Sequence, residues 1–377
     1  MGDFLAIVDR LYIHFPFCRH LCNYCDFYKK VRVDSSETLG FHKYLENSVE
    51  PHNQLLNENG LTMTDMASVF IGGGTPSLWG KEGAEYLDDF FQKLNVKLRK
   101  DCEFTVEVNP GSWKEEDLMA WRKLGANRFS LGIQSFNQTF IKHLDRVHSL
   151  DDVVDTLKFF NERELNFSVD FMLGLPFSER DNRDVLEELK EVLKYNPNHF
   201  SLYILTTKEN YVHHNHLPTE EWIEKEYMDV SNFLKKHGYL HYEVSNFAKP
   251  GFESTHNLAY WESDSVAAFG PSATGFLSSS RTRYKWRPAR AEFEIEKLTE
   301  KEFKLEQLYM KFRTNRGLNF DDFFSEAERP IIKNLTAEWQ KTGLLESVGD
   351  GLYRLTSKGY LSMDGLLNQI FARTKSL

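Results

Sequence analysis

Short apolar runs alternate with longer amphipathic stretches over the first two thirds of the chain. The short runs are rich in β-branched and aromatic residues, as strands are, whereas the longer stretches repeat apolar residues at helical spacing. Strands that alternate with helices predict a parallel sheet joined by right-handed crossovers. The predicted strands are residues 11–16, 68–72, 103–109, 129–134, 167–173 and 199–205, and the predicted helices include 115–124, 150–164 and 183–195.

Six strand–helix units are too few for a closed eightfold barrel. We therefore predict an α/β fold whose core is a partial (β/α)6 barrel of the TIM type. In barrels of this kind the chemistry collects at the carboxyl ends of the strands. Polar and glycine-rich segments close several predicted strands, and we expect them to meet in one site: residues 18–25, 72–76, 107–110, 134 and 170–176.

The pattern changes near residue 218. A charged helix is predicted over 220–236, and from about residue 291 the chain is predicted to be mainly helical. Two short strands at 344–348 and 352–355 flank a Gly-Asp-Gly turn, which predicts a hairpin between helices. This arrangement resembles a winged-helix module, and its mixture of lysine and glutamate favours a packing role. The predicted units are a barrel domain over 1–217, an extension over 218–290 and a small C-terminal helical, winged-helix-like domain over 291–377.

The composition limits the classes of protein to which this chain can belong. Hydrophobic residues make up 41% of the 377 positions and aromatic residues 14%, which supports a packed core. A net charge of −10 argues against a general nucleic-acid binder, although residues 281–290 form a local basic run. No apolar run has the length of a membrane helix. The chain is poor in cysteine and does not open with a secretory signal, so we expect a reducing, cytoplasmic location.

Three of the four cysteines stand together as Cys18, Cys22 and Cys25, in the spacing C-x-x-x-C-x-x-C after the first predicted strand. Structural zinc sites and electron-transfer clusters usually take four protein ligands. Three thiolates leave one iron of a cluster open to a small molecule. A disulfide with one spare thiol is an alternative, and a zinc site completed by His14 or His20 is a stronger one.

Motifs along the chain resemble the radical SAM proteins related to oxygen-independent coproporphyrinogen III oxidase. Within that group they most resemble HemW, a family of haem chaperones. The resemblance runs in order from Tyr12 to about Arg287 and is weaker beyond. The motifs are YIHFPFCRHLCNYCDF, IGGGTPS, EVNPGS, LGIQSF, LDRVH, DFMLGLP and YEVSNFAKPGFESTHNLAYW.

This resemblance implies a 4Fe–4S cluster held by Cys18, Cys22 and Cys25, with S-adenosylmethionine chelating the fourth iron. It places Tyr24 against the adenine and the planar fork of Arg146 on the ligand carboxylate. No residue is assigned a catalytic role, because the cofactors supply the difficult chemistry. The implied contacts to S-adenosylmethionine are Tyr12, Tyr24, Gly73, Gly74, Thr75, Glu107, Gln134, Arg146 and Asp170. From the residues alone there is an alternative for each motif: the glycines form a tight strand–helix turn, and Glu107 is a solvated residue at the end of a strand.

The stretch HNLAYW, residues 256–261, resembles the HNxxYW signature of HemW and implies haem binding. His256 would be an axial ligand to haem iron, with Tyr260 and Trp261 against the porphyrin. The basic run over 281–290 would pair with the propionates. A core histidine with a satisfied hydrogen bond is the alternative for His256. The partners implied are haem, haem-accepting proteins and an electron donor such as flavodoxin or ferredoxin, without nucleic acid; a transient association with a membrane stays open.

Decarboxylation of coproporphyrinogen III is the second hypothesis. The resemblance implies that the oxidases carry a further cysteine where this chain has Phe27. They also carry a substantial N-terminal extension, whereas this chain reaches Cys18 almost at once. The chain also departs from the HemW pattern. Asn23 replaces a common proline and Asp145 a usual glycine, while Lys208 and Thr274 stand where relatives often have glutamate and histidine. The last two leave open a member with another substrate.

Overall fold

The computed structural model describes residues 6–374, and within them a nine-stranded sheet forms the core. Its order is β11-β1-β4-β5-β6-β7-β8-β10-β9, and the run from β1 to β8 is parallel throughout. The predicted α/β partial barrel with six parallel strands is confirmed. These strands are β1 (Ala6–Phe15), β4 (Leu61–Gly73), β5 (Leu98–Val108), β6 (Arg128–Gln134), β7 (Phe167–Leu173) and β8 (His199–Ile204).

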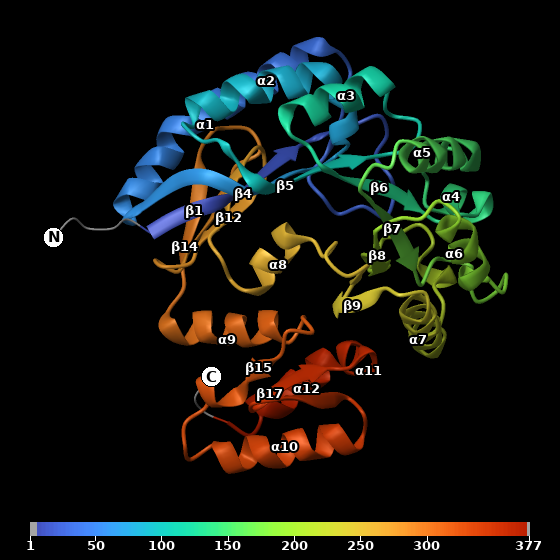
Figure 1. Cartoon of the computed structure of the whole chain (residues 1–377), viewed down its shortest axis with the longest axis vertical. Helices are drawn as coiled ribbons and strands as arrows, with labels where there is room; N and C mark the ends of the chain where they lie inside the picture. The colour runs from blue at the N-terminus through green and yellow to red at the C-terminus, as the bar shows by residue number, and fades with distance from the viewer. Residues whose placement is uncertain (1–5, 375–377) are drawn as a thin grey trace.

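Helices cover the convex face of this sheet (Figure 1). Their ends follow local sequence signals: α5 begins at a capping box of Ser149 and Asp152, and α3 has acidic residues in its first turn and basic residues in its last. The helices are α1 (Ser35–Glu58), α2 (Gly80–Lys93), α3 (Glu115–Leu124), α4 (Gln138–His143), α5 (Leu150–Glu162), α6 (Val185–Leu193) and α7 (Glu220–Lys236), with short 3-10 turns η1 (Pro76–Leu78) and η2 (His214–His216).

Both edges of the sheet are completed by the segment after α7. On one edge β11 (Ala267–Phe269) pairs parallel with β1, and on the other β10 (Asn246–Ala248) pairs antiparallel with β8 and with β9 (Leu240–Glu243). Between them α8 (Thr255–Trp261) lies on the concave side of the sheet (Figure 1). The segment 218–290 therefore contributes strands to the barrel sheet itself.

Two smaller sheets follow. The first joins β12 (Thr274–Leu277), β13 (Thr282–Trp286) and β14 (Phe293–Lys297) in antiparallel order. The expectation of helix from residue 291 was wrong over β14, because its alternating apolar and charged residues pair with β13. The chain continues through α9 (Glu300–Lys311) into the C-terminal unit.

The C-terminal unit contains the predicted hairpin, formed by β16 (Leu345–Gly349) and β17 (Leu352–Leu355). A third strand, β15 (Leu318–Asn319), pairs with β17 and completes a winged-helix-like arrangement with the helices around it. Those are η3 (Phe320–Asp322), α10 (Arg329–Lys341), α11 (Ser357–Leu361) and α12 (Met363–Phe371). No helix within residues 6–374 is long and apolar enough to cross a membrane.

Candidate functional site

The three clustered cysteines lie on a loop that leaves and returns to the top of β1. The loop starts at β2 (Phe17–Cys18) and ends at β3 (Lys30–Val31), and these two short strands pair in parallel. This pairing anchors Cys18 at the base of the loop, while Cys22 and Cys25 lie along it. All three are free thiols that line one cavity of about 260 Å³. The structure therefore brings the three predicted cluster ligands together.

The thiols need a cationic partner to be ionised together. Burial raises the pKa of both Cys18 and Cys22, and the neighbouring cysteines raise it further. The Arg146 guanidinium acts in the opposite direction on Cys22. Because only the thiolate binds metal, an iron centre would offset this repulsion and the loss of solvation. The donor set fits a cluster held by three thiolates.

The two histidines of the zinc alternative are already engaged in hydrogen bonds, His14 through both ring nitrogens and His20 through Nε2. His14 uses both ring nitrogens, with Nδ1 2.9 Å from the Tyr12 hydroxyl and Nε2 2.8 Å from the Tyr28 carbonyl oxygen. His20 holds Nε2 2.7 Å from a carboxylate oxygen of Asp145. Across residues 6–374 no three His, Cys, Asp or Glu side chains converge as a set of ligands for a single ion.

A second cavity of about 340 Å³ adjoins the thiols and opens at the carboxyl ends of the parallel strands. Cys25 contributes to both cavities. The volume of this second cavity is in the range of about 300–1,000 Å³ that small-molecule sites have. Most of the predicted contacts to S-adenosylmethionine line it: Tyr24, Gly73, Gly74, Thr75, Glu107, Gln134, Arg146 and Asp170.

The turn at the end of β4 needs glycine because neighbouring parts of the chain leave no room for a side chain. Gly73 has φ +112°, and a Cβ there would lie 2.6 Å from the His14 ring. A Cβ on Gly74 would lie 2.6 Å from the Phe17 carbonyl oxygen. Only glycine lets β4 close against β1 and the cysteine loop, so that the Gly73 amide reaches Glu107 Oε2 at 3.1 Å.

Two partly buried carboxyl groups line the inner wall of this cavity. Burial raises the pKa of Glu107 to about 8, and the nearby Asp170 adds to the shift. Burial also raises the pKa of Asp170, which accepts a hydrogen bond from the Ser130 hydroxyl at 2.9 Å. Buried carboxyl groups favour a ligand that brings positive charge or hydrogen-bond donors.

Arg146 spans the space between the two cavities. Its guanidinium donates to the Gly132 carbonyl oxygen at 2.9 Å and to Asn109 Oδ1 at 2.8 Å. The preceding Asp145 has φ +54°, a conformation that glycine adopts freely and that aspartate tolerates. The unusual Asp145 is thus compatible with the turn, and it also pairs with His20.

Lys208, the other unusual residue near the barrel mouth, forms an ion pair with Asp26 of the cysteine loop at 2.7 Å. The pair connects the segment after β8 to that loop across the open side of the barrel. Both side chains are largely exposed, so the pair contributes about 0–1 kcal/mol to stability.

Two predicted residues lie apart from this cavity. Tyr12 faces a neighbouring cavity, and His256 is only 1% exposed within the concave side of the barrel. His256 Nδ1 lies 2.8 Å from the Ser68 hydroxyl, and its ring packs against Phe70 and Tyr260. Burial lowers the pKa of His256 to about 3, so the imidazole is neutral. Haem ligation by His256 stays a prediction.

The sequence reasoning missed several cavity residues. Ser130 and Gly132 precede the predicted Gln134 at intervals of two on β6, and this strand period was the available signal. Also missed were Asp26, Phe27, Tyr203, Leu205 and Thr206. Asn109, in the predicted segment 107–110, donates to the Thr75 hydroxyl at 3.0 Å and accepts from Arg146.

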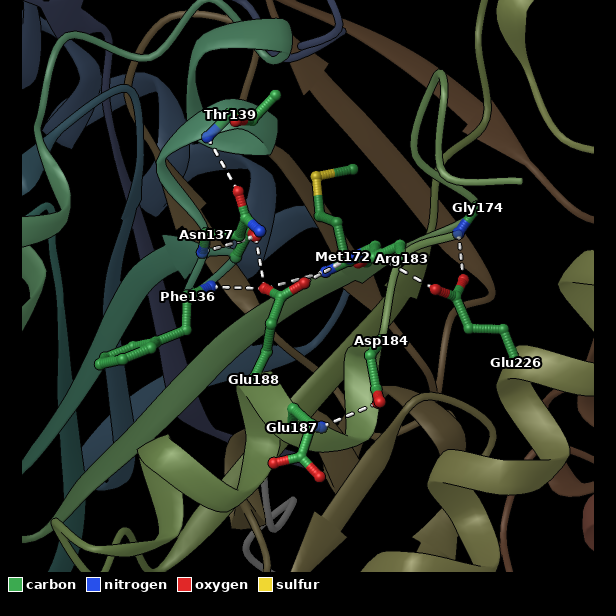
Figure 2. Close-up of polar contacts among 11 residues, drawn as sticks. Phe136, Asn137, Thr139, Met172, Gly174, Arg183, Asp184, Glu187, Glu188 and Glu226 are labelled. Atoms are coloured by element: carbon green, nitrogen blue, oxygen red, sulfur yellow. Dashed lines mark hydrogen bonds and ion pairs between the residues drawn. The ribbon is translucent and has the colours of Figure 1, made fainter. Parts of the chain in front are cut away.

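A buried ionic cluster, Arg183 with Glu188 and Glu226, supports the loops that follow β6 and β7 (Figure 2). Arg183 lies 2.6 Å from Glu188 and donates to the Met172 carbonyl oxygen at 2.8 Å. Glu188 accepts from the Phe136 amide and Glu226 from the Gly174 amide, each at 2.7 Å. The cluster ties α6 and α7 to the strand ends that carry the cavity wall.

The raised pKa of Glu107 predicts a pH dependence of stability in the cofactor-free protein. Its folded pKa of about 8 lies above the ordinary 4.5, so the protonated side chain favours folding. That contribution is complete below about pH 4.5 and is lost as the pH rises through about 8. In urea unfolding at pH 5, 6.5 and 8, Glu107→Gln should gain stability relative to wild type as the pH rises. The exposed control Glu326→Gln should show a constant difference; a constant difference for Glu107→Gln would contradict the prediction.

Comparison with known proteins agrees with this geometry. Residues 12–189 match the radical SAM superfamily, which implies a 4Fe–4S cluster and S-adenosylmethionine. The chain is 30% identical to the heme chaperone HemW of Bacillus subtilis over 96% of this chain and 97% of the relative. It is 35% identical to HemW of Buchnera aphidicola subsp. Schizaphis graminum, over 71% and 70% respectively.

The solved structure of coproporphyrinogen III oxidase, HemN, from Escherichia coli is similar in fold. It has a TM-score of 0.78 over 98% of this chain and 91% of the oxidase, with 20% sequence identity. At that identity the likeness shows the fold alone. The near full-length sequence relationship decides the family: this chain belongs to the heme chaperone HemW family of the radical SAM superfamily.

Proposed function

We propose that this protein binds haem and transfers it to haem-requiring acceptor proteins, in the cytoplasm. The observation that carries the proposal is the alignment with HemW of Bacillus subtilis, named a heme chaperone, over nearly the whole of both chains. An electron donor such as flavodoxin or ferredoxin would reduce the cluster.

In this proposal Cys18, Cys22 and Cys25 hold the 4Fe–4S cluster. S-adenosylmethionine occupies the adjoining cavity, with Arg146 on its carboxylate and Glu107 among its hydrogen-bonding groups. The bound pair supplies reductive cleavage of a sulfonium carbon–sulfur bond. The chain itself would position the ligand between the strand ends, with Glu107 and Asp170 lining the wall of the cavity.

Haem ligation by His256 would require a change in the structure. Its Nε2 has no hydrogen-bond partner among the described residues, yet the side chain is 1% exposed. A haem iron cannot reach this nitrogen unless Tyr260 or α8 moves. Ligation by His256 would therefore belong to a rearranged, loaded state.

We also propose that residues 218–290 are an extension that completes both edges of the barrel sheet, and that the C-terminal unit from about residue 291 is a packing domain. The Val244 amide donates to the Arg313 carbonyl oxygen at 2.8 Å, and the Asn315 amide donates to that of Tyr242 at 2.9 Å. These backbone bonds tie the segment after α9 to the edge of the barrel sheet. A unit attached through its backbone in this way is suited to bracing the barrel.

The oxidase alternative is tested in the same sample as the chaperone. Protein purified and reconstituted without oxygen should contain about four irons per chain. It should bind S-adenosylmethionine and take up haem with a Soret band that saturates at one equivalent. Coproporphyrinogen III with S-adenosylmethionine and a reductant should remain unchanged. Rapid decarboxylation without haem binding would overturn the proposed function.

A further inference from the structure

A third cavity, of about 540 Å³, lies beside the proposed S-adenosylmethionine cavity. The two share Asp26 and Phe27 of the cysteine loop. Phe27 is 66% exposed, so an aromatic side chain stands open at the boundary between them. A flat apolar ligand in the third cavity would cover this ring while lying next to the cofactor.

Aromatic side chains from separate elements form the wall of this cavity. Tyr12 comes from β1, Tyr28 from the cysteine loop and Tyr260 from α8. The HNLAYW stretch therefore presents Tyr260 to the cavity, whereas His256 packs behind that ring. Aromatic rings with polar ends offer apolar faces to a conjugated macrocycle and leave hydroxyl groups at its edge.

The lysine that lines this cavity, Lys285, forms no ion pair among the described residues, although Glu294 lies across from it on β14. Lys285 on β13 lies directly across from Thr274 on β12, and both line the cavity. Among residues 6–374 no carboxylate is within ion-pair distance of Lys285, whereas Arg283 pairs with Glu296 and Glu306. The carboxylate that lines the cavity, Asp26, is already paired with Lys208.

Histidine is not available as a ligand from this wall. His14 lines the cavity, but both its nitrogens are engaged by Tyr12 and by the Tyr28 carbonyl oxygen. Thr274 faces the cavity with a small side chain, which leaves volume rather than a ligand. Recognition here would rest on ring contacts and on charge.

We propose that this cavity is the docking site for the tetrapyrrole, with the ring against Tyr12, Tyr28 and Tyr260 and one propionate on Lys285. The inference rests on the proposed function and locates its cargo. The macrocycle would lie next to the S-adenosylmethionine cavity, with Phe27 between the two ligands. Initial binding would not need the iron to reach His256.

The test is titration of full-length, cluster-loaded protein with haemin, followed by Soret absorbance. Lys285→Glu should weaken binding at least about tenfold, because it replaces a charge-assisted contact with repulsion. Thr274→Trp should fill the cavity and reduce binding by a similar or larger factor. The exposed controls Lys297→Glu, on the neighbouring strand β14, and Thr62→Trp should bind haemin like wild type. S-adenosylmethionine binding should be unchanged in all four variants, and thermal unfolding should show that each of them is folded.

Haemin dimethyl ester separates charge from shape. It lacks the propionate charges, so Lys285→Glu and wild type should bind it equally, while Thr274→Trp should still bind it poorly. If both cavity variants bind haemin as tightly as wild type does, the cavity is not the docking site. If wild type itself does not bind haemin, the proposed function fails instead.

Discussion

Replacing Cys22 with alanine should abolish assembly of the cluster. Two thiolates cannot hold the cube that three hold, and Cys22 lies between Cys18 and Cys25 in the same cavity. After reconstitution without oxygen, iron and sulfide should fall from about four each per chain to near zero. Binding of S-adenosylmethionine, measured by equilibrium dialysis, should fall with them, because the amino acid part of the ligand no longer has the fourth iron of the cluster to chelate.

The remaining cysteine provides the matched control. Cys102 is buried on β5, away from the cavity, and burial raises the pKa of its thiol to about 12. Cys102→Ala should therefore keep a full complement of iron and sulfide. A Cys22→Ala protein that retains the complete cluster and its affinity for S-adenosylmethionine would contradict the assignment of the three ligands.

Replacing Arg183 with methionine should lower the free energy of unfolding by about 3–5 kcal/mol. The guanidinium is fully buried, and its removal leaves Glu188 and Glu226 without their cation (Figure 2). Burial already raises the pKa of Glu226, so this carboxyl group should take up a proton in the variant. Urea unfolding of the cofactor-free protein measures the loss.

Arg180→Met is the control, because Arg180 is largely exposed and pairs with the adjacent Asp181. Its effect should stay below about 1 kcal/mol. The Arg183 variant should also bind S-adenosylmethionine more weakly. The ionic cluster of Arg183, Glu188 and Glu226 holds the strand ends that carry Gln134 and Met172, and these two residues line the cavity. Equal stability of the two variants would show that the cluster does not support this wall.

Much of the barrel follows from local patterns in the sequence. Strands 129–134 and 167–173 were predicted to within a residue, because short buried runs between helical stretches allow one interpretation. The hairpin at β16 and β17 followed from a Gly-Asp-Gly turn between alternating residues. The prediction of helix over β14 was wrong, since five alternating residues next to a long helix are too short a run to be distinguished from it.

The edges of the sheet could not be predicted in this way. The pairing of Leu11 with Ala267 closes one edge across some two thirds of the chain. At the other edge β10 pairs with β8 after an intervening helix, as in the pairing of Asn246 with Ser201. Three-residue strands such as β11 carry almost no local signal. Their place is decided by which sheet edge remains open once the parallel strands have assembled.

By itself the sequence determined the parallel strand–helix core and the family, and it predicted the three cysteine ligands, because these depend on residue type and spacing. Tertiary structure alone decided which side chains share a cavity. In the folded chain His256 is buried on the concave side of the sheet, where its ring packs against Tyr260. Asp26 forms an ion pair with Lys208, whereas Lys285 forms none among the described residues. The physical reason is that burial and charge pairing depend on neighbours brought together by long-range closure, and residue order does not encode those neighbours locally.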